Sequence, residues 1–345
     1  MRLERMNDNC IFAFIHELEP VWGALSVLSG ETIHTFCTEI YGTEQITAWK
    51  RKYGFLFETF KVVDATIHAN LMDYLLEMPV EDVTLERLRN TLLALPAEEF
   101  VWRHLSLEYM SKDASLDTLR RAMTDDEALD EVYSWVAEHC TSFLAFSAFV
   151  RQSRRFLTDF FSLASEMQTS ALTDALEKQT EKIERLRQKV QNGAEGDLLE
   201  LSQELMGKTF RNRGPYTEFV FLPSYLIPMW ACRYFDTEGE YKRQILFLSL
   251  RTGHNPEDTI KALKAIADPT RYQILTILAQ EGPMRGLDIA KRVSIATSTV
   301  SHHMEQMKES GLITEEPVKN SKFYGLSKQR AKELLDEIAK DLEIE

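Results

Sequence analysis

The stretch Thr297–Leu312 reads T-S-T-V-S-H-H-M-E-Q-M-K-E-S-G-L, and its spacing decides how the C-terminal third of the chain folds. Its large apolar residues recur four and then three positions apart, which is one face of an α-helix: Val300, Met304 and Met307. The hydroxyl of Thr297 or Ser298 is suited to cap the start of this helix. Gly311 is suited to end it. The stretch therefore predicts a short amphipathic helix with a defined stop.

The outward face of this helix carries short hydrogen-bonding groups. The residues on this face are Ser298, Thr299, Ser301, His302 and Gln306, together with Thr297 at the start of the helix. Short polar side chains at the N-terminal end of an exposed helix suit a DNA major groove, where they reach base edges and phosphates. We therefore predict that these six residues contact double-stranded DNA. His303, about 100° further round the helix, is expected to be half-buried.

The flanking residues extend this helix into a larger motif. Residues 286–293 read as a second helix, and the three-residue turn 294–296 gives helix-turn-helix spacing. Residues 312–318 and 322–326 read as two strands around a polar tip. A helix-turn-helix followed by such a hairpin is a winged helix. We expect Lys319 and Lys322 of the wing to hold phosphate or to enter the neighbouring minor groove.

Four short motifs occur in this part of the chain at defined spacings. They are Asp268-Pro269-Thr270-Arg271, Asp288-Ile289-Ala290, Ser298-Thr299-Val300-Ser301-His302-His303-Met304 and Ser310-Gly311-Leu312-Ile313. With them, the run 263–326 resembles the ArsR-type winged-helix transcription regulators. The resemblance implies a homodimer, with the first and last helices of the domain at the interface. It also implies a regulator of transcription, most simply a repressor acting at a palindromic operator.

Length and composition indicate more than one domain. At 345 residues the chain exceeds a typical single domain. We expect a mostly helical domain at 1–250, a linker at 251–257 and the winged-helix domain at 258–345. No stretch approaches 18 consecutive apolar residues, so no membrane span is expected. The four cysteines form no Cys-x-x-Cys pair, which favours the reducing cytoplasm.

The net charge of −14 at first argues against binding to nucleic acid. Within residues 284–330, however, 8 basic residues face 5 acidic ones. The local balance decides whether phosphate is attracted. The modest excess predicts weak binding to DNA of arbitrary sequence.

The first 250 residues read as mainly α-helical with a small antiparallel sheet. The apolar stripe over 49–77 predicts one long helix. Strands are expected at 218–222, 229–235 and 244–250, where β-rich runs alternate with turn residues. Residues 10–15 fit either a strand or a buried helical turn. The predicted fold class is therefore mainly α, with a C-terminal winged helix-turn-helix.

Two features of the N-terminal part have alternative interpretations. An aromatic stripe packs a core or lines an apolar ligand pocket: Phe143, Phe146, Phe149 and Phe156. A heptad seam begins at Leu172 and runs to Val190. It packs either on its own domain or on a second subunit. One hypothesis is thus a domain that senses a small apolar effector. The alternative is a dimerisation or protein-interaction module without a ligand.

Signatures of enzymes and of metal centres are missing from the sequence. It contains no Gly-rich phosphate loop, no G-x-S-x-G and no H-E-x-x-H. We therefore expect no catalytic activity, no cofactor and no metal site. A metal-responsive regulator, or a thiol-responsive one using Cys140 or Cys232, is the remaining alternative.

Overall fold

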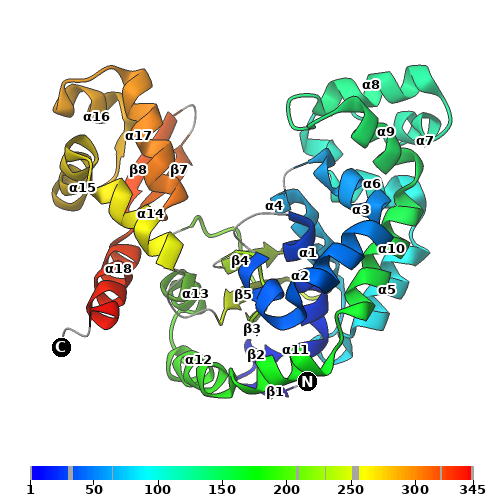
Figure 1. Ribbon diagram of the computed structural model, residues 1–345, viewed down its shortest axis with the longest axis horizontal. Helices are drawn as coiled ribbons and strands as arrows, with labels where there is room; N and C mark the ends of the chain where they lie inside the picture. Colours follow the sequence, from blue (N-terminus) through cyan, green and yellow to red (C-terminus); the bar gives the residue numbers. More distant parts are fainter. Residues whose placement is uncertain are drawn as a thin grey trace. The chain divides into compact units, whose positions relative to one another are not determined.

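The computed structural model describes residues 2–29, 34–63, 65–206, 210–229, 231–250, 256–318 and 321–342 (Figure 1). Its contacts divide the chain into two compact units. Unit 1 comprises residues 1–201 and 212–250, and unit 2 comprises 202–211 and 251–345. The domain boundaries expected from the sequence stay a prediction, and residues 251–255 of the expected linker lie outside the described residues.

Unit 1 contains a five-stranded sheet in the order β1-β2-β3-β5-β4. Its strands are β1 (Arg2–Arg5), β2 (Cys10–Phe14), β3 (Glu218–Ser224), β4 (Ala231–Phe235) and β5 (Arg243–Ser249). The three strands expected near residues 218–250 are confirmed, and residues 10–14 form a strand. The sheet is nevertheless mixed, because β3 pairs in parallel with both β2 and β5. The expectation of an antiparallel sheet was wrong.

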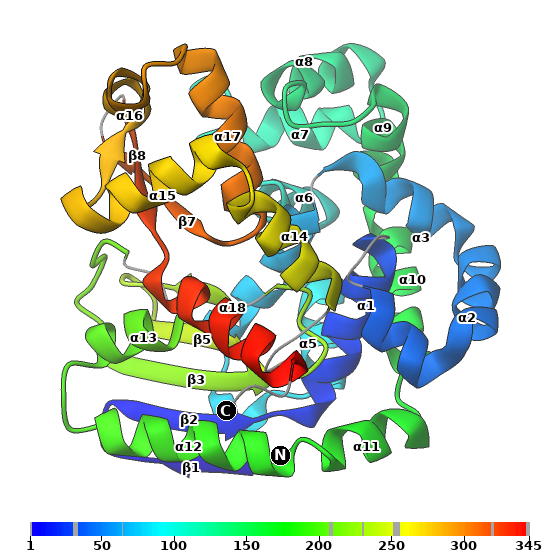
Figure 2. The same cartoon turned by 60° about the vertical axis from the view of Figure 1, so that its left-hand side comes forward.

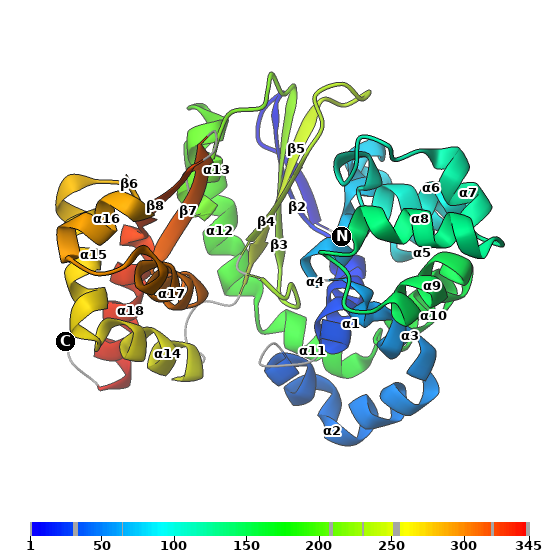
Figure 3. The same cartoon turned by 90° about the horizontal axis from the view of Figure 1, so that it is seen from above.

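Burial of both faces of this sheet explains the parallel pairing. Ile11, Val220 and Ile245 belong to the main core, whereas their alternating neighbours Phe12 and Phe221 are buried outside it. Parallel strands are normally covered on both faces and read as continuous apolar runs. Figure 3 views the sheet edge-on, with α12 on one face and α1 on the other.

Helices form the rest of unit 1 between β2 and β3. They are α1 (Glu19–Ser29), α2 (His34–Lys52), α3 (Gly54–Thr59), α4 (Ala65–His68), η3 (Ala69–Glu77), α5 (Leu85–Ala94), α6 (Ala97–His104), α7 (Leu116–Ala122), α8 (Asp126–Val136), α9 (Phe143–Arg151), α10 (Ser153–Glu166), α11 (Ser170–Glu177) and α12 (Thr180–Gly193). A further helix, α13 (Leu198–Met206), begins in unit 1 and ends in unit 2.

The long helix expected over 49–77 is broken into shorter pieces. Its apolar stripe is buried as expected, from Trp49 to Leu75. Helix α3 ends at Thr59, a 3₁₀-helix follows at Phe60–Val62, and Val63 is extended with φ −134° and ψ 172°. Beyond it, Ala69–Glu77 continues as a 3₁₀-helix. Apolar periodicity therefore predicted the buried side chains correctly but not the continuity of the backbone.

The heptad seam is divided between α11 and α12. Leu172 and Leu176 are buried on α11, which packs against α2, and Ile183 and Val190 are buried on α12. Helix α12 packs against β2 and β3 of the same chain. The seam therefore faces its own unit, which resolves the alternative in favour of intramolecular packing.

Unit 2 contains a helical scaffold with a three-stranded wing (Figure 2). Its elements are α14 (Pro256–Ile266), α15 (Pro269–Glu281), β6 (Met284–Arg285), α16 (Gly286–Val293), α17 (Thr297–Glu309), β7 (Ile313–Val318), β8 (Ser321–Leu326) and α18 (Lys328–Asp341). Helix α17 contacts both α16 and β7. The winged helix is confirmed, with the short strand β6 as an addition.

The fold class is confirmed. The regular structure of the described residues consists of eighteen α-helices, five 3₁₀-helices and two small sheets, and a winged helix-turn-helix lies at the C-terminal end. Among the same residues, no helix combines the length and the apolar character needed to cross a membrane.

Candidate nucleic-acid interface

Helix α17 is anchored by the apolar face expected from its sequence. Val300, Met304 and Met307 are each at most 1% exposed. Ser294 adopts a left-handed conformation with φ 55° and lets the chain turn from α16 into α17. Gly311, with φ 73°, ends the helix, and the N–H of Leu312 then donates to the carbonyl oxygen of Met307 over 3.0 Å. The opposite face is thereby fixed outward.

That outward face presents most of the predicted contact residues to solvent. The exposed ones are Thr297, Ser298, Thr299, Ser301 and His302. The expected cap was wrong, because the N-cap residue is Ala296 and no side chain caps the helix. The first N–H groups of α17 are thus left without a side-chain acceptor, as in helix ends that hold phosphate.

Gln306 differs from the other predicted contact residues because it is half-buried. Its side-chain oxygen accepts a hydrogen bond from Arg271 of α15. Its amide nitrogen lies 3.2 Å from Nε2 of His302, one helical turn earlier. In the sequence Arg271 stands out only as part of the D-P-T-R motif, and its pairing with Gln306 was not predicted, since 35 residues separate the two.

His303 is half-buried, as expected from its position on α17. Its Nδ1 is buried and has no hydrogen-bond partner among the described residues. The ring centres of His302 and His303 are 6.3 Å apart. The two adjacent imidazoles therefore differ in environment, and His302 is the one that faces outward.

The wing places a lysine beside an acidic residue. Lys322, on β8, is exposed, and its Nζ lies 3.0 Å from Glu315 on β7. Burial alone would raise the pKa of Glu315, but the hydrogen bond and charge of Lys322, together with Lys308, hold it below its ordinary value. The other predicted wing residue, Lys319, lies outside the described residues.

Part of the basic charge of unit 2 is already neutralised within it. Arg285 pairs with Asp288 over 2.8 Å, and Arg292 pairs with Glu281 over 2.7 Å. Pairs of this kind near the surface attract phosphate less than free cations do. Fewer free cations are therefore left for phosphate, and weak binding to DNA of arbitrary sequence stays a prediction.

The aromatic stripe of unit 1 is mostly interior. Phe146, Phe149 and Phe156 are fully buried, whereas Phe143 is 41% exposed and stacks edge-on against Tyr133. Phe149 packs against His104 and Phe156 packs against His68, at centroid distances typical of aromatic packing. Phe146 packs against Tyr133. Core packing accounts for this arrangement, and a ligand role for the four phenylalanines stays a prediction.

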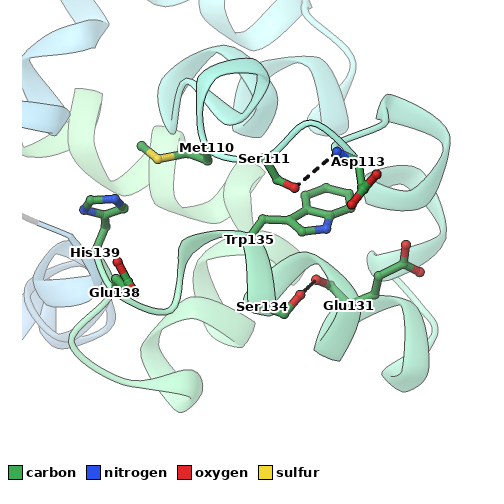
Figure 4. Close-up of a pocket in the computed structure, with 8 residues that line it drawn as sticks. All are labelled: Met110, Ser111, Asp113, Glu131, Ser134, Trp135, Glu138 and His139. Carbon is green, nitrogen blue, oxygen red and sulfur yellow. Dashed lines mark hydrogen bonds between the residues drawn. The ribbon is translucent and has the colours of Figure 1, made fainter. Parts of the chain in front are cut away.

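A polar pocket of about 640 Å³ lies elsewhere in unit 1 (Figure 4). Its lining residues are Met110, Ser111, Asp113, Glu131, Ser134, Trp135, Glu138 and His139. Three carboxylates and an indole ring suit a cation better than an apolar molecule. The pocket and the predicted apolar site are therefore different places.

Metal and thiol chemistry find little support in the geometry. The described residues contain no group of three or more histidine, cysteine or acidic side chains able to hold a metal ion. Burial raises the pKa of the Cys140 thiol to about 11. A raised pKa keeps a thiol protonated and so lowers its reactivity.

The C-terminal part matches known proteins. A family model described as bacterial regulatory protein, arsR family, matches residues 268–315. The cadmium resistance transcriptional regulatory protein CadC homolog of Staphylococcus aureus is 32% identical over 82 residues, covering 24% of this chain and 68% of that protein. The chain belongs to the ArsR family of bacterial regulatory proteins. The transcriptional repressor SdpR of Bacillus subtilis (strain 168) is 36% identical over 64 residues, covering 19% of this chain and 70% of SdpR.

A crystal structure of an ArsR family transcriptional regulator also aligns with this ArsR-family chain, at 24% identity and a TM-score of 0.25. The alignment covers 27% of this chain and 94% of that one. Membership of the ArsR family makes the protein a DNA-binding transcriptional regulator. The matched residues 268–315 include the helix-turn-helix, and they leave unit 1 unassigned.

Proposed function

We propose that the protein is a homodimeric repressor whose α17 helices read a palindromic operator in double-stranded DNA. The observation that carries the proposal is the outward face of α17, where hydroxyl and imidazole groups are exposed above a buried apolar face. Such groups, held on a rigid helix, can reach base edges in the major groove. The name of the similar SdpR, a transcriptional repressor, supports repression.

The contacts follow from position on the helix and wing. The proposed base-reading residues are Thr297, Ser298, Thr299, Ser301 and His302. Gln306, the sixth contact residue expected from the sequence, is half-buried and bonded to Arg271, so we propose that it supports this set from behind. The uncapped N–H groups of α17 meet a phosphate. Lys322 and Lys319 hold the neighbouring backbone, and Lys322 leaves Glu315 to do so. The base contacts give sequence preference, whereas the phosphate contacts position the protein on DNA. The salt dependence of the affinity distinguishes the two, because phosphate contacts weaken as salt rises.

Dimerisation is supported by apolar side chains on the first and last helices of unit 2. Ile260 and Leu263 of α14 are 48% and 40% exposed, and Leu335 of α18 is 66% exposed. Helices α14 and α18 contact each other, so these side chains lie on adjoining elements. A second copy of the chain that covers these side chains forms a two-fold symmetric dimer. Its two α17 helices would then bind operator half-sites about 10 bp apart.

The test is a fluorescence-anisotropy titration against DNA from the region upstream of the protein's own gene, with random DNA as the control. We expect tighter binding to the upstream DNA and a two-fold symmetric footprint. Repeating the titration at about 50 and 200 mM salt separates phosphate contacts from base contacts. Equal affinity for both DNAs, together with no footprint on a library of random sites, contradicts the proposal.

We further propose that unit 1 modulates DNA affinity by binding a small apolar ligand beside the phenylalanine stripe. The size of unit 1 supports a role beyond DNA binding. Phe143 is part-exposed, so we propose that a ligand reaches the stripe at this residue. The alternative, a dimerisation module without a ligand, loses its main support because the heptad seam packs within its own unit, with α11 against α2 and α12 against the sheet.

An uncharged apolar fluorophore, N-phenyl-1-naphthylamine, tests this second proposal. We expect saturable binding to the full chain, a change in DNA affinity when the site is filled, and weaker binding to Phe143→Glu. Glu138→Gln, in the separate polar pocket, is the control. Absence of saturable binding, or equal binding to Phe143→Glu, argues against an apolar ligand at the stripe.

A further inference from the structure

Arg271, in the first turn of α15, connects two other helices of unit 2. Its Nε donates to the carbonyl oxygen of Ala265 over 2.7 Å, and its Nη2 donates to that of Lys264 over 2.9 Å. Both carbonyls belong to the last turn of α14. Its Nη1 donates to the side-chain oxygen of Gln306 on α17. Because a guanidinium group is planar and its donors are fixed, these three bonds determine where Gln306 lies.

The chemistry of Arg271 also determines which end of the Gln306 amide faces it. A guanidinium group has five donors and no acceptor, so only the amide oxygen can pair with it. The amide nitrogen, which only donates, must then face His302. Its distance of 3.2 Å from Nε2 of His302 is that of a hydrogen bond.

The donor from Gln306 in turn determines the tautomer of His302. Nε2 can accept only when it carries no proton, so a neutral ring must carry its proton on Nδ1. Either form with a proton on Nε2 would set two N–H donors against each other. Among the described residues, Nδ1 of His302 has no hydrogen-bond partner, and the side chain is exposed. The ring therefore presents one N–H donor outward.

We propose that Arg271 and Gln306 are positioning residues that hold His302 as an Nδ1–H donor, so that it reads a hydrogen-bond acceptor on a base edge. This inference rests on the proposed function and deepens it. In the major groove the acceptors are N7 of either purine, O6 of guanine and O4 of thymine, whereas cytosine presents an N–H donor. His302 thus selects against cytosine at its contact, and we assign it a purine N7. Gln306 contributes by orienting His302, not by contacting a base itself.

The tautomer can be measured without DNA. Long-range ¹H–¹⁵N correlation spectra of the full chain report which ring nitrogen carries the proton, and His302→Gln identifies the signals among those of 8 histidines. We expect His302 to be predominantly the Nδ1–H form. A ring that is predominantly Nε2–H overturns the proposal, whatever the protein does with DNA.

Substitutions at Gln306 should change which ring nitrogen of His302 carries the proton, while leaving the buried face of α17 intact. In Gln306→Glu the carboxylate accepts hydrogen bonds from both Arg271 and His302, so we expect Nε2 of His302 to carry a proton. Gln306→Met has a similar size and no hydrogen-bonding group, so we expect a mixture of tautomers. Arg271→Met lets the amide turn over and should also give a mixture, whereas Arg271→Lys keeps a donor and should restore Nδ1–H. If the His302 signals are the same in Gln306→Glu, Gln306→Met and wild type, Gln306 does not set the tautomer and the proposal is contradicted.

Modified operators locate the acceptor. Replacing purines one at a time by their 7-deaza analogues removes N7 alone, and we expect one position to weaken wild-type binding by about three- to tenfold. The same replacement should leave the affinity of His302→Ala nearly unchanged. If only a methylphosphonate linkage shows this dependence on His302, the acceptor is a phosphate and the base-reading assignment is overturned. If wild-type protein has no operator, the proposed function fails, and the spectra still decide the tautomer.

Discussion

Thr299 is exposed near the start of α17 and combines a hydroxyl with a methyl group. The hydroxyl can donate to or accept from a base edge, and the methyl group can contact a thymine methyl. We expect Thr299→Ala to weaken operator binding by about 1–3 kcal/mol and to leave random DNA unaffected. Anisotropy titrations with both DNAs measure the difference. An equal loss on both would assign Thr299 to a phosphate instead.

Lys322 provides the matching test of a positioning contact. Lys322→Ala should weaken operator and random DNA alike and lower the slope of log affinity against log salt by about 1. Since Lys322 pairs with Glu315 in the free protein, Glu315→Gln should release it and strengthen binding to both DNAs. A change in sequence preference in Lys322→Ala would contradict a purely electrostatic role.

His68 and His104 form a buried pair, and protonation of His104 opposes folding. Both are fully buried, with Nδ1 of His68 2.9 Å from Nε2 of His104. Burial, and then the neighbouring His68, lower the pKa of His104 well below its ordinary value. Unfolded histidine titrates near pH 6.5, so below that pH the unfolded chain takes up a proton that the folded core refuses. Stability should therefore fall as pH falls, by up to about 1.4 kcal/mol per unit.

Urea unfolding between about pH 7.5 and 5.5 measures this effect. The decline should be steeper in wild type than in His104→Gln, while the exposed His139→Gln behaves as wild type. Burial raises the pKa of Asp73 to about 6, which acts in the opposite direction. Asp73 is present in wild type and in both variants, so its contribution to the pH dependence of stability cancels when their slopes are compared. Equal slopes in wild type and His104→Gln would mean that the pair is hydrated or protonated in the folded state.

Sequence periodicity predicted the side chains of α17 because the helix is local. Val300 and Met304 are buried and His302 is exposed, as the 3.6-residue repeat requires. The partners of those side chains were not predictable. Arg271 reaches Gln306 across 35 residues, and His68 reaches His104 across 36. Such pairs depend on tertiary packing, which local spacing does not contain.

A substitution on α12 tests whether the heptad seam packs within its own chain. Ile183 is 5% exposed beneath α12, so Ile183→Glu places a charge against the sheet. We expect the free energy of unfolding to fall by about 3 kcal/mol or more. The control, Gln188→Glu, adds the same charge on the exposed side and should change it by less than about 0.5 kcal/mol. Urea unfolding and sedimentation should be measured together. A stable monomer produced by Ile183→Glu would return the seam to a second subunit.

The sheet shows where element prediction succeeds and fails. Apolar runs bounded by turn residues identified β3, β4 and β5 correctly. Pairing was not predictable, because β2 lies next to β3 although more than two hundred residues separate them along the chain. A strand buried on both faces has no alternation to show which neighbour it has. Position along the chain favoured an antiparallel meander, and long-range packing produced a mixed sheet.

The two units differ in how far sequence alone explains them. In unit 2, motifs predicted the fold, the exposed helix and the family, because winged helices keep short local signatures. In unit 1, apolar periodicity predicted helices, but the role of the unit depends on tertiary contacts, which local spacing does not contain. The internal packing of α12 also leaves unit 1 without the seam that first suggested a dimer. Self-association is then expected to depend on α14 and α18.

Exposed leucines on α18 and α9 allow that expectation to be tested. Leu335 on α18 is 66% exposed and Leu144 on α9 is 81% exposed, so glutamate at either position leaves the buried core intact. We expect Leu335→Glu to sediment as a monomer and to lose most of its operator affinity, since two half-sites are no longer linked. Leu144→Glu should remain a dimer. If Leu144→Glu dissociates and Leu335→Glu does not, the interface belongs to unit 1, and operator half-sites would be spaced by that unit instead.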